Sequence, residues 1–367
     1  MNNTNYNKRQ FWQYKRLYGT NKTITNQNQN QNSNHAKTKR PVFHLINNKI
    51  ATDPELINRL STLYIPPAYK DIVIAKSANN KIQAIGTDTR GRRQYIYNAN
   101  YTKKRNDRKY DDILELGKKI SKIEKDNETA LHNLIRKPYH KWSLPVDYIP
   151  IIIYMLRTYH FRIGNERYID ENNSYGITTL KTDHIKFLDK SKNKFTIQFV
   201  GKKGIVNTYT DDNPLIFKLL QMLITAANKE DGYLFKYANA NANANAFITP
   251  EEIQKHFYDT YNAYITPKMF RTWYGNYHFL LYLKKLLSEG IIKPRLTRHA
   301  KMQIVKDCSE YVSSKLNNTP TVSKKSYIDN KILEIIMRNP YTLANKIPEL
   351  PENQHAFLYS IITKLRH

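Results

Sequence analysis

The spacing of apolar residues changes near residue 105, and this change constrains the fold more than any other feature. Residues 41–105 carry short β-favouring runs such as VFHLI and DIVIAKSANNKIQAIG, with turn signals at Asn79-Asn80 and Arg90-Gly91. From residue 106 the spacing becomes helical, as in DDILELGKKISKIEK and VDYIPIIIYMLRTYH. The sequence therefore predicts an α+β chain: a small, mainly β module over 41–105, joined near residues 98–110 to a larger, mainly α domain over 106–367.

The larger domain contains one return to the strand pattern. HIKFL, KFTIQFV and IVNTYT are separated by DKSKN and GKKG, which predicts a three-stranded meander with Lys202 at the tip of its second hairpin. Helix start signals follow at Asn213-Pro214, at Thr249-Pro250 and at Thr266-Pro267.

Two segments have low complexity. Residues 1–40 are rich in Asn and Gln with scattered basic residues, and they carry too little apolar area to offset chain entropy. We predict a disordered, weakly anion-seeking tail there. The run YANANANANAF at 237–247 lies between well-patterned segments and is predicted to be a surface loop.

The charge of the chain indicates a polyanionic partner. Lys and Arg total 59 against 31 Asp and Glu, which gives a net charge of +28 that is spread along the sequence. Such a surface favours nucleic acid. A membrane surface is the competing interpretation, but no apolar run approaches the roughly 20 residues that span a bilayer, and the first residues show no signal-peptide pattern.

Cysteine and histidine usage bears on compartment and metal binding. The single cysteine, Cys308, excludes an internal disulfide framework and a cysteine-based zinc site, and it favours a reducing, intracellular compartment. The 11 histidines show no HxxxH-type pairing. We therefore expect no metal site.

Tyr327 is the candidate nucleophile, although it is one of 28 tyrosines. The run SKKSYIDNKILEIIM is interpreted as one helix with Ser323 as N-cap, in which Tyr327 lies about 140° from the stripe formed by Ile328, Ile332, Ile335 and Ile336. A packing role is therefore disfavoured, which leaves an exposed surface tyrosine or a chemical role. Lys324 and Lys325 near a helix N-terminus would favour a phosphate beside it.

A phenol with a pKa near 10 attacks a phosphodiester poorly unless cations neutralise the developing charge. Two arginines stand in suitable contexts. Arg162 follows a buried helix in YHFRIGNERY, and Arg271 lies in the first turns of a later helix in KMFRTWYGN. Taken alone, each arginine is more typical of an ordinary solvated side chain than of a catalytic one.

Five motifs then carry a specific resemblance. They are IGTDTRGRRQYIYN, FRIGNERYIDENNSYGITTLKTDHIKF, QFVGKKG, KMFRTWYGNY and NNTPTVSKKSYI. In order and spacing, from about residue 41 to 345, the chain resembles the type IB DNA topoisomerases of the poxvirus and bacterial branch. The resemblance implies an enzyme that acts on duplex DNA, joins its tyrosine to a 3′-phosphate, lets the 5′-OH end rotate and religates. It implies no cofactor: neither ATP nor an obligatory divalent metal. We further expect a monomer whose two modules clamp the duplex.

The resemblance also assigns roles to individual residues. Tyr327 matches the nucleophile, and Arg162 and Arg271 match the arginines that hold the nonbridging oxygens of the scissile phosphate. Lys202 matches the lysine that donates a proton to the leaving 5′ oxygen, with its neighbour Lys203 as the alternative.

Asn318 departs from the family pattern. Most members have a histidine nine residues before the tyrosine, where this chain has Asn318. An asparagine amide donates a neutral hydrogen bond but supplies no full charge, so the substitution bears on rate more than on reaction type. His299 is the alternative source of the missing donor.

The resemblance assigns further residues to DNA contact. In RGRRQYIY the strand alternation places Arg92 and Gln94 on one face and Tyr95 and Tyr97 on the other. The alternative for this segment is a tyrosine-rich sheet core with rim arginines. The remaining predicted DNA contacts are Arg167, Tyr168 and Lys268.

Two other functions remain open at this point. A tyrosine recombinase shares the same chemistry, but such enzymes usually place a helical clamping domain where residues 41–105 indicate strands. A non-catalytic DNA-binding protein would leave Tyr327 without a role. The poxvirus-like pattern and the Asn- and Lys-rich composition indicate a large DNA virus, with nucleus, cytoplasm and virion as open sites of action.

Overall fold

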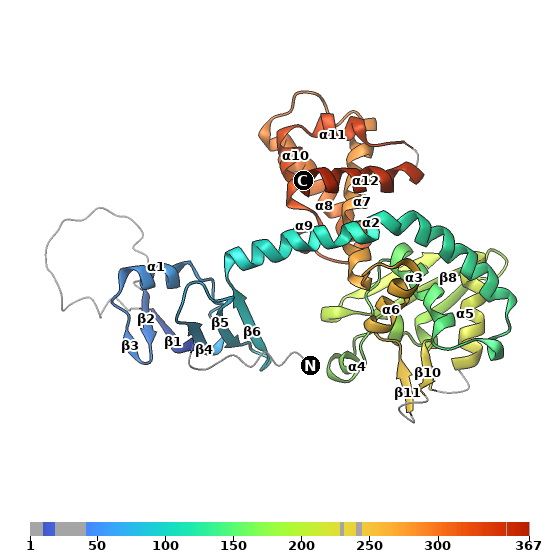
Figure 1. Cartoon of the computed structure of the whole chain (residues 1–367), viewed down its shortest axis with the longest axis horizontal. Coiled ribbons are helices and arrows are strands. Elements are labelled where there is room, and N and C mark those ends of the chain that lie inside the picture. Colours follow the sequence, from blue (N-terminus) through green and yellow to red (C-terminus); the bar gives the residue numbers. More distant parts are fainter. Residues whose placement is uncertain (1–9, 19–41, 228–230, 240–243, 350, 367) are drawn as a thin grey trace. The chain divides into compact units, whose positions relative to one another are not determined.

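The computed structural model describes residues 10–18, 42–227, 231–239, 244–349 and 351–366. The chain divides into two compact units, Met1–Arg108 and Lys109–His367. The α+β class is confirmed, because the first unit is built on a sheet and the second is mostly helical (Figure 1). In the described part of the chain, none of the helices combines the length and apolar character that crossing a membrane requires.

The first unit is an antiparallel sheet of order β3-β2-β1-β4-β5-β6 with one helix, α1 (Pro54–Thr62). Its core is formed by Tyr14, Leu60, Ile65, Ile74 and Ala84. The strands are β1 (Phe11–Tyr18), β2 (Val42–Ile46), β3 (Lys49–Ile50), β4 (Lys70–Ala75), β5 (Ile82–Thr87) and β6 (Arg93–Tyr97).

Strand β1 corrects the prediction of a disordered tail over residues 1–40. Residues 11–18 pair with β2 on one side and β4 on the other, so they lie inside the sheet. The reason is the β-favouring run FWQYKRLY: Tyr14 is buried, and its hydroxyl lies 2.7 Å from His44 Nδ1. The surrounding Asn- and Gln-rich composition concealed this short strand. The rest of the predicted tail, except Gln10 directly before β1, lies outside the described residues.

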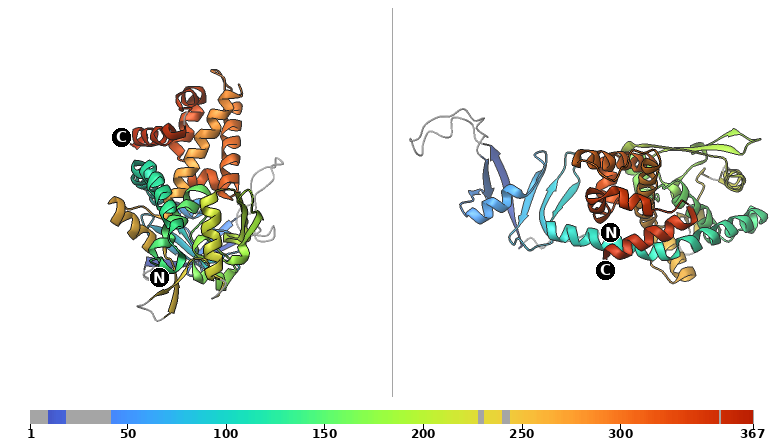
Figure 2. Two further views of the ribbon diagram at one scale, coloured as in Figure 1. Left: turned by 90° about the vertical axis from the view of Figure 1, so that its right-hand side faces the viewer. Right: turned by 90° about the horizontal axis from the view of Figure 1, so that it is seen from above.

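Helix α2 (Ala99–Arg136) is continuous across the boundary between the units (Figure 2). Its 38 residues bury Ile113, Leu116, Ile120 and Ile123, which recur at helical spacing as the sequence indicated. Helix α7 (Pro267–Ser288) lies at the centre of the second unit and contacts α3, α6, α8, α9, α11 and α12. The surrounding helices are α3 (Ile149–Thr158), α4 (Glu166–Asn172), α5 (Pro214–Ala227), α6 (Pro250–Tyr261) and α8 (Arg298–Leu316).

The predicted meander is present as β7 (Ile185–Asp189), β8 (Lys194–Val200) and β9 (Val206–Asp211). Alternate residues of β8 are buried: Phe195, Ile197 and Phe199. The helix starts at Pro214, Pro250 and Pro267 are also confirmed, and Thr249 and Glu252 form the reciprocal capping box.

The prediction of a surface loop over residues 237–247 is wrong at both ends of that range, where the chain forms strands. Strands β10 (Lys236–Asn239) and β11 (Ala244–Phe247) pair antiparallel. Tyr237 provides the reason, because its ring is buried and its hydroxyl donates to Glu252 Oε1 at 2.5 Å. Residues 240–243 lie outside the described part.

The remaining helices are α9 (Pro320–Tyr327), α10 (Asn330–Arg338), α11 (Pro340–Lys346) and α12 (Pro351–Arg366). Helices α8, α10, α11 and α12 gather around one end of α7 (Figure 1). This arrangement brings the residues around 327 against the first turns of α7.

Candidate active site

Tyr327 is the last residue of α9, not an early residue of a longer helix. Pro320 begins α9, Thr319 caps it, and Ile328 is extended. The Asp329 carboxylate then caps α10 by accepting from Lys331 N at 3.0 Å. The single helix predicted from Ser323 is therefore wrong, and so is the helix N-terminus proposed beside Tyr327. Because the chain turns there, Tyr327 is only 8% exposed.

A close approach of α9 to α7 accounts for this burial. A Cβ added at Gly275 would lie 2.9 Å from Tyr327 Cβ, which is too close for two such atoms. Glycine at this position in α7 therefore leaves room for the tyrosine.

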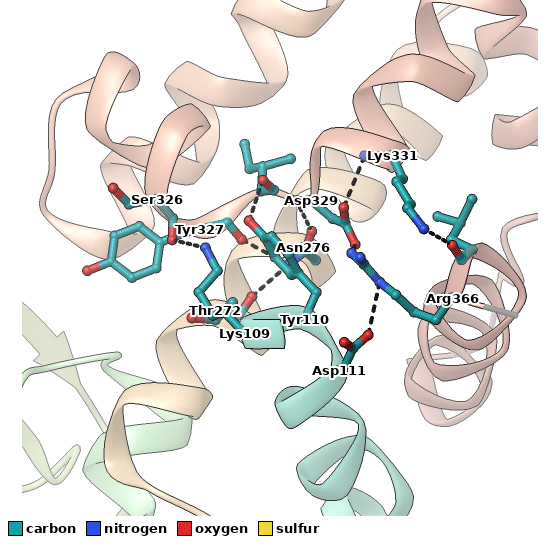
Figure 3. Close-up of polar contacts among 12 residues, drawn as sticks. Lys109, Tyr110, Asp111, Thr272, Asn276, Ser326, Tyr327, Asp329, Lys331 and Arg366 are labelled. Atoms are coloured by element: carbon teal, nitrogen blue, oxygen red, sulfur yellow. Dashed lines mark hydrogen bonds and ion pairs between the residues drawn. The ribbon is translucent and has the colours of Figure 1, made fainter. Parts of the chain in front are cut away.

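The backbone around Tyr327 is held by buried side chains (Figure 3). Asn276 donates to Tyr327 O at 2.8 Å and accepts from Asp329 N at 2.8 Å. Lys109 Nζ donates to Ser326 O at 2.8 Å, and the Tyr110 hydroxyl donates to Ile328 O at 2.5 Å. The carbonyls of residues 326–328 thus each have a side-chain donor, while the ring of Tyr327 points away from this network.

Arg271 lies against the Tyr327 phenol. Its Nε is 3.4 Å from the Tyr327 hydroxyl, and its guanidinium carbon is 5.2 Å from the ring centre. The other two nitrogens donate to carbonyls, Nη1 to His160 O and Nη2 to Leu316 O at 2.7 Å. Burial lowers the pKa of Arg271 to about 10, so this 3%-exposed side chain remains cationic at neutral pH.

Arg162 and Asn318 form the second part of the site. Arg162 Nη2 donates to Asn318 Oδ1 at 2.7 Å, which joins the segment after α3 to the connection between α8 and α9. Asn318 Nδ2 is buried and has no hydrogen-bond partner among the residues that the structure describes. Buried amide groups normally have a hydrogen-bond partner. An unpaired Nδ2 at this position is therefore available to donate to an acceptor oxygen of a bound ligand.

The two arginines change the acidity of the tyrosine. Burial alone would raise the pKa of Tyr327, but the charges and hydrogen bonds of Arg271 and Arg162 outweigh it and lower the pKa to about 8. A substantial fraction of the phenol is then ionised slightly above neutral pH, and the structure groups this tyrosine with two cations, one of which also holds the Asn318 side chain.

Lys202 is where the sequence placed it, at the turn between β8 and β9, and its side chain is exposed. Among the described residues, no hydrogen bond or ion pair joins Lys202 to Arg162, Arg271, Asn318 or Tyr327. The structure therefore brings together four of the five predicted residues. Lys203, the alternative, adopts a left-handed conformation with φ +67° and is exposed as well.

His299 is excluded as a substitute for the family histidine. It lies in the first turn of α8, whereas Asn318 follows the end of that helix. At 1.5 Å per residue the two ends are about 25 Å apart.

Two of the predicted DNA contacts in the first unit, Arg92 and Gln94, bind Asp88. Arg92 Nη2 and Gln94 Nε2 both reach Asp88 Oδ2, at 2.8 and 2.9 Å. The hydrogen bond from Arg92 lowers the pKa of Asp88 to about 2. These contacts order the turn before β6.

Tyr95 and Tyr97 lie on the other side of β6, as alternation predicted. Their ring centres are 6.4 Å apart, and the ring of Tyr97 also contacts that of Tyr101 in a tilted arrangement, with the centres 5.6 Å apart. Ile96, between them in sequence, packs on the core of the first unit. Both tyrosines are half-buried, so the alternative of a tyrosine-rich sheet core is not supported.

The other predicted DNA contacts are on helix surfaces. On α4, Arg167 pairs with Glu171 at 2.6 Å, and Tyr168 is 54% exposed. Lys268 is exposed in the first turn of α7, one turn before the buried Arg271. Among the described residues, no hydrogen bond or ion pair joins Arg167, Tyr168 or Lys268 to Tyr327, Arg271, Arg162 or Asn318.

Sequence reasoning missed the residues that support the tyrosine. They are Gly275, Asn276, Lys109 and Tyr110. A glycine followed by an asparagine inside the otherwise apolar helix pattern of MFRTWYGNYHFLL was a usable signal, because both residues are poor choices for an apolar helix face unless something packs closely there.

The fold and this site define a class: an α+β protein with a buried tyrosine of lowered pKa held against arginine side chains. The family model for the catalytic core of eukaryotic DNA topoisomerase I matches residues 98–352, and the model for the N-terminal domain of bacterial DNA topoisomerase IB matches residues 43–88. The chain belongs to the type IB DNA topoisomerase family.

Viral relatives agree with this assignment. The DNA topoisomerase 1B of Acanthamoeba polyphaga mimivirus is 31% identical over 305 residues, which cover 81% of this chain and 84% of the relative. The DNA topoisomerase 1B of Vaccinia virus (strain Copenhagen) is 25% identical over 79% of this chain and 84% of its own length. The DNA topoisomerase 1 of Rabbit fibroma virus (strain Kasza) is 24% identical over 76% and 80%. The recombinase alternative is not favoured.

Proposed function

We propose that this enzyme relaxes supercoiled duplex DNA through a transient covalent bond between Tyr327 and a 3′-phosphate. The Tyr327 oxygen attacks the scissile phosphorus, and the bond from phosphorus to the 5′ oxygen breaks. The 5′-OH end rotates about the intact strand, and its attack on the phosphotyrosine restores the DNA and frees the phenol. The observation that carries this proposal is the contact between Arg271 and Tyr327, with the lowered pKa of the phenol.

We assign the transition-state contacts to the neighbouring residues. Arg162 and Arg271 hold the nonbridging oxygens, and Asn318 Nδ2 donates to one of them. Lys202 supplies a proton to the leaving 5′ oxygen, which requires that bound DNA lie against the β8–β9 turn. Its exposed position at a turn suits a group that meets its partner only when DNA binds.

The reaction is proposed to need neither ATP nor a divalent metal. The phosphotyrosine conserves the energy of the phosphodiester bond, and guanidinium groups supply the positive charge. In the described part of the chain, no group of three or more His, Cys, Asp or Glu side chains is placed to hold a metal ion. We further propose a monomer that acts inside the cell, in the life cycle of a large DNA virus.

The DNA surface is proposed to include Arg92, Gln94, Tyr95 and Tyr97 of the first unit, and Arg167, Tyr168 and Lys268 of the second, with the two units clamping the duplex. A net charge of +28 supports phosphate contacts as the main source of affinity. Binding should then weaken steeply with salt.

The direct test is to trap the covalent intermediate. A duplex with a nick placed just 3′ of the cleavage site loses its short 5′-OH strand after cleavage and cannot be religated. Mass spectrometry of the trapped protein then identifies the modified residue. A 3′-phosphotyrosyl bond at Tyr327 supports the proposal, and a bond at another residue or to the 5′ end contradicts it. Relaxation of a plasmid that carries no recombination site separates the proposal from a recombinase.

A further inference from the structure

A buried ion pair lies two residues after Tyr327 and has no role in the chemistry proposed above. Arg366 Nη2, in the last turn of α12, contacts Asp329 Oδ2, and the two side chains are 6% and 2% exposed. Figure 3 shows Arg366 extending from α12 toward Asp329 and Asp111. A buried arginine and carboxylate are costly to desolvate, so an uncharged pair would serve packing equally well.

Asp329 is placed to transmit the position of Arg366 to the tyrosine. Its carboxylate also caps α10 through Lys331 N, and its N–H donates to Asn276 Oδ1 at 2.8 Å. The same Asn276 side chain donates to Tyr327 O at 2.8 Å. Asn276 therefore links the backbone of Asp329 to that of Tyr327. A shift of Asp329 would move the Asn276 side chain and, through it, the Tyr327 backbone.

Arg366 also contacts α2. Its Nε lies 3.6 Å from Asp111 Oδ1, and its guanidinium carbon is 5.3 Å from the centre of the Tyr110 ring. The Tyr110 hydroxyl donates to Ile328 O at 2.5 Å. One guanidinium thus contacts Asp329 directly and lies against the ring of Tyr110, which holds the Ile328 carbonyl.

We propose that Arg366 is a positioning residue for strand cleavage. Together with Asp329 and Asp111 it fixes residues 327–329, and so keeps the Tyr327 hydroxyl beside Arg271. This proposal rests on the proposed function, because it assumes that Tyr327 is the nucleophile. It assigns to the last turn of α12 a role in the reaction beyond packing in the helical unit.

The test compares Arg366→Met and Asp329→Asn with the wild-type enzyme in single-turnover cleavage of a short duplex. All are assayed at saturating enzyme and well below each protein's melting temperature. We expect cleavage to slow by about 10- to 100-fold, since displacement of a reacting group by about 1 Å costs up to about 100-fold. Lys364→Met is the matched control, because it removes the same charge from an exposed site on the same helix. Its rate should match the wild type.

Four readouts separate positioning from stability alone. The midpoint of the pH–rate profile should rise in both variants, because the phenol moves away from the Arg271 charge. In a further variant, Arg366→Ala, which leaves space for the ion, added guanidinium should partly restore cleavage. The DNA affinity of Arg366→Met and Asp329→Asn should stay within about twofold of wild type. The double variant should be no slower than the slower single variant, since both remove one interaction. Additive losses would contradict the coupling.

The outcomes are distinguishable from failure of the proposed function. Wild-type cleavage by Tyr327→Phe would remove the function itself. If Tyr327→Phe is inactive and Arg366→Met cleaves at the wild-type rate, the positioning role alone is overturned. The same conclusion follows if Arg366→Met lowers the melting temperature but leaves the cleavage rate and the pH midpoint unchanged. If Arg366→Met does not fold, Arg366→Lys replaces it: a smaller but measurable slowing supports the proposal, and an unchanged rate overturns it.

Discussion

Arg271 Nε lies 3.4 Å from the Tyr327 hydroxyl, and the arginine is locked in this position by two backbone carbonyls, those of His160 and Leu316. The guanidinium is thus oriented before DNA arrives. A preorganised cation needs little rearrangement as negative charge develops on phosphorus. The same charge acts on the free enzyme by lowering the pKa of Tyr327 to about 8.

The first prediction concerns pH. If the phenolate attacks, the cleavage rate rises with pH as Tyr327 loses its proton and levels off above about 8, instead of continuing to rise toward the ordinary tyrosine pKa near 10. Single-turnover cleavage between pH 6 and 10 measures this profile. Arg271→Gln should be slower and should shift the midpoint upward. A wild-type midpoint near 10 would contradict the electrostatic role of the arginines.

The second prediction is that Tyr327→Phe abolishes relaxation and leaves DNA binding nearly unchanged. The substitution removes one oxygen and no positive charge. Plasmid relaxation and an equilibrium binding titration measure the two effects separately. Relaxation at the wild-type rate would remove Tyr327 from the mechanism.

The sequence was sufficient to predict the elements that have a strong local pattern. The meander, the start of α6 at Pro250 and the change from strands to helices all follow from alternation, capping residues and periodicity. The family motifs then identified Arg162, Arg271, Asn318 and Tyr327, which the structure brings together.

Tertiary contacts decided what the sequence could not show. The break between α9 and α10 depends on the Asp329 cap and on Asn276, which is 51 residues from the carbonyl of Tyr327 that it holds. The strand β1 depends on two neighbours that the composition of residues 1–40 does not reveal. Helical periodicity alone therefore misplaced Tyr327 on an exposed surface.

The third prediction tests the close approach of α9 to α7. Gly275→Ala would place a Cβ 2.9 Å from Tyr327 Cβ, so one of the two helices must shift. We expect a loss of about 1–3 kcal/mol in the free energy of unfolding and slower cleavage. Chemical denaturation and single-turnover cleavage measure the two effects. Ser288→Ala, in the last turn of α7, is the control, and equal behaviour of the two variants would contradict the packing argument.

The fourth prediction concerns metal ions and nucleotide. Relaxation should persist in EDTA and without ATP, because arginines and an amide supply the groups that stabilise the transition state. Modest stimulation by Mg²⁺ is compatible with this view, since divalent ions also screen phosphate contacts and speed DNA release. Complete dependence on Mg²⁺ after chelation and re-addition would contradict it.

The last prediction concerns Asn318, whose Oδ1 accepts from Arg162 and whose buried Nδ2 has no hydrogen-bond partner within the described part of the chain. If Nδ2 donates to a nonbridging oxygen, Asn318→Ala should slow single-turnover cleavage by about 10- to 1,000-fold, with little change in DNA affinity, because the bond strengthens as charge develops. Asn318→Asp has the same shape and keeps an acceptor for Arg162, but it replaces the donor with a negative charge. It should therefore be at least as slow as the alanine variant. Asn318→His restores a donor and should retain activity, with a gain at lower pH where imidazole carries charge. An aspartate variant that cleaves as fast as wild type would show that Asn318 only anchors Arg162 and donates nothing to the phosphate.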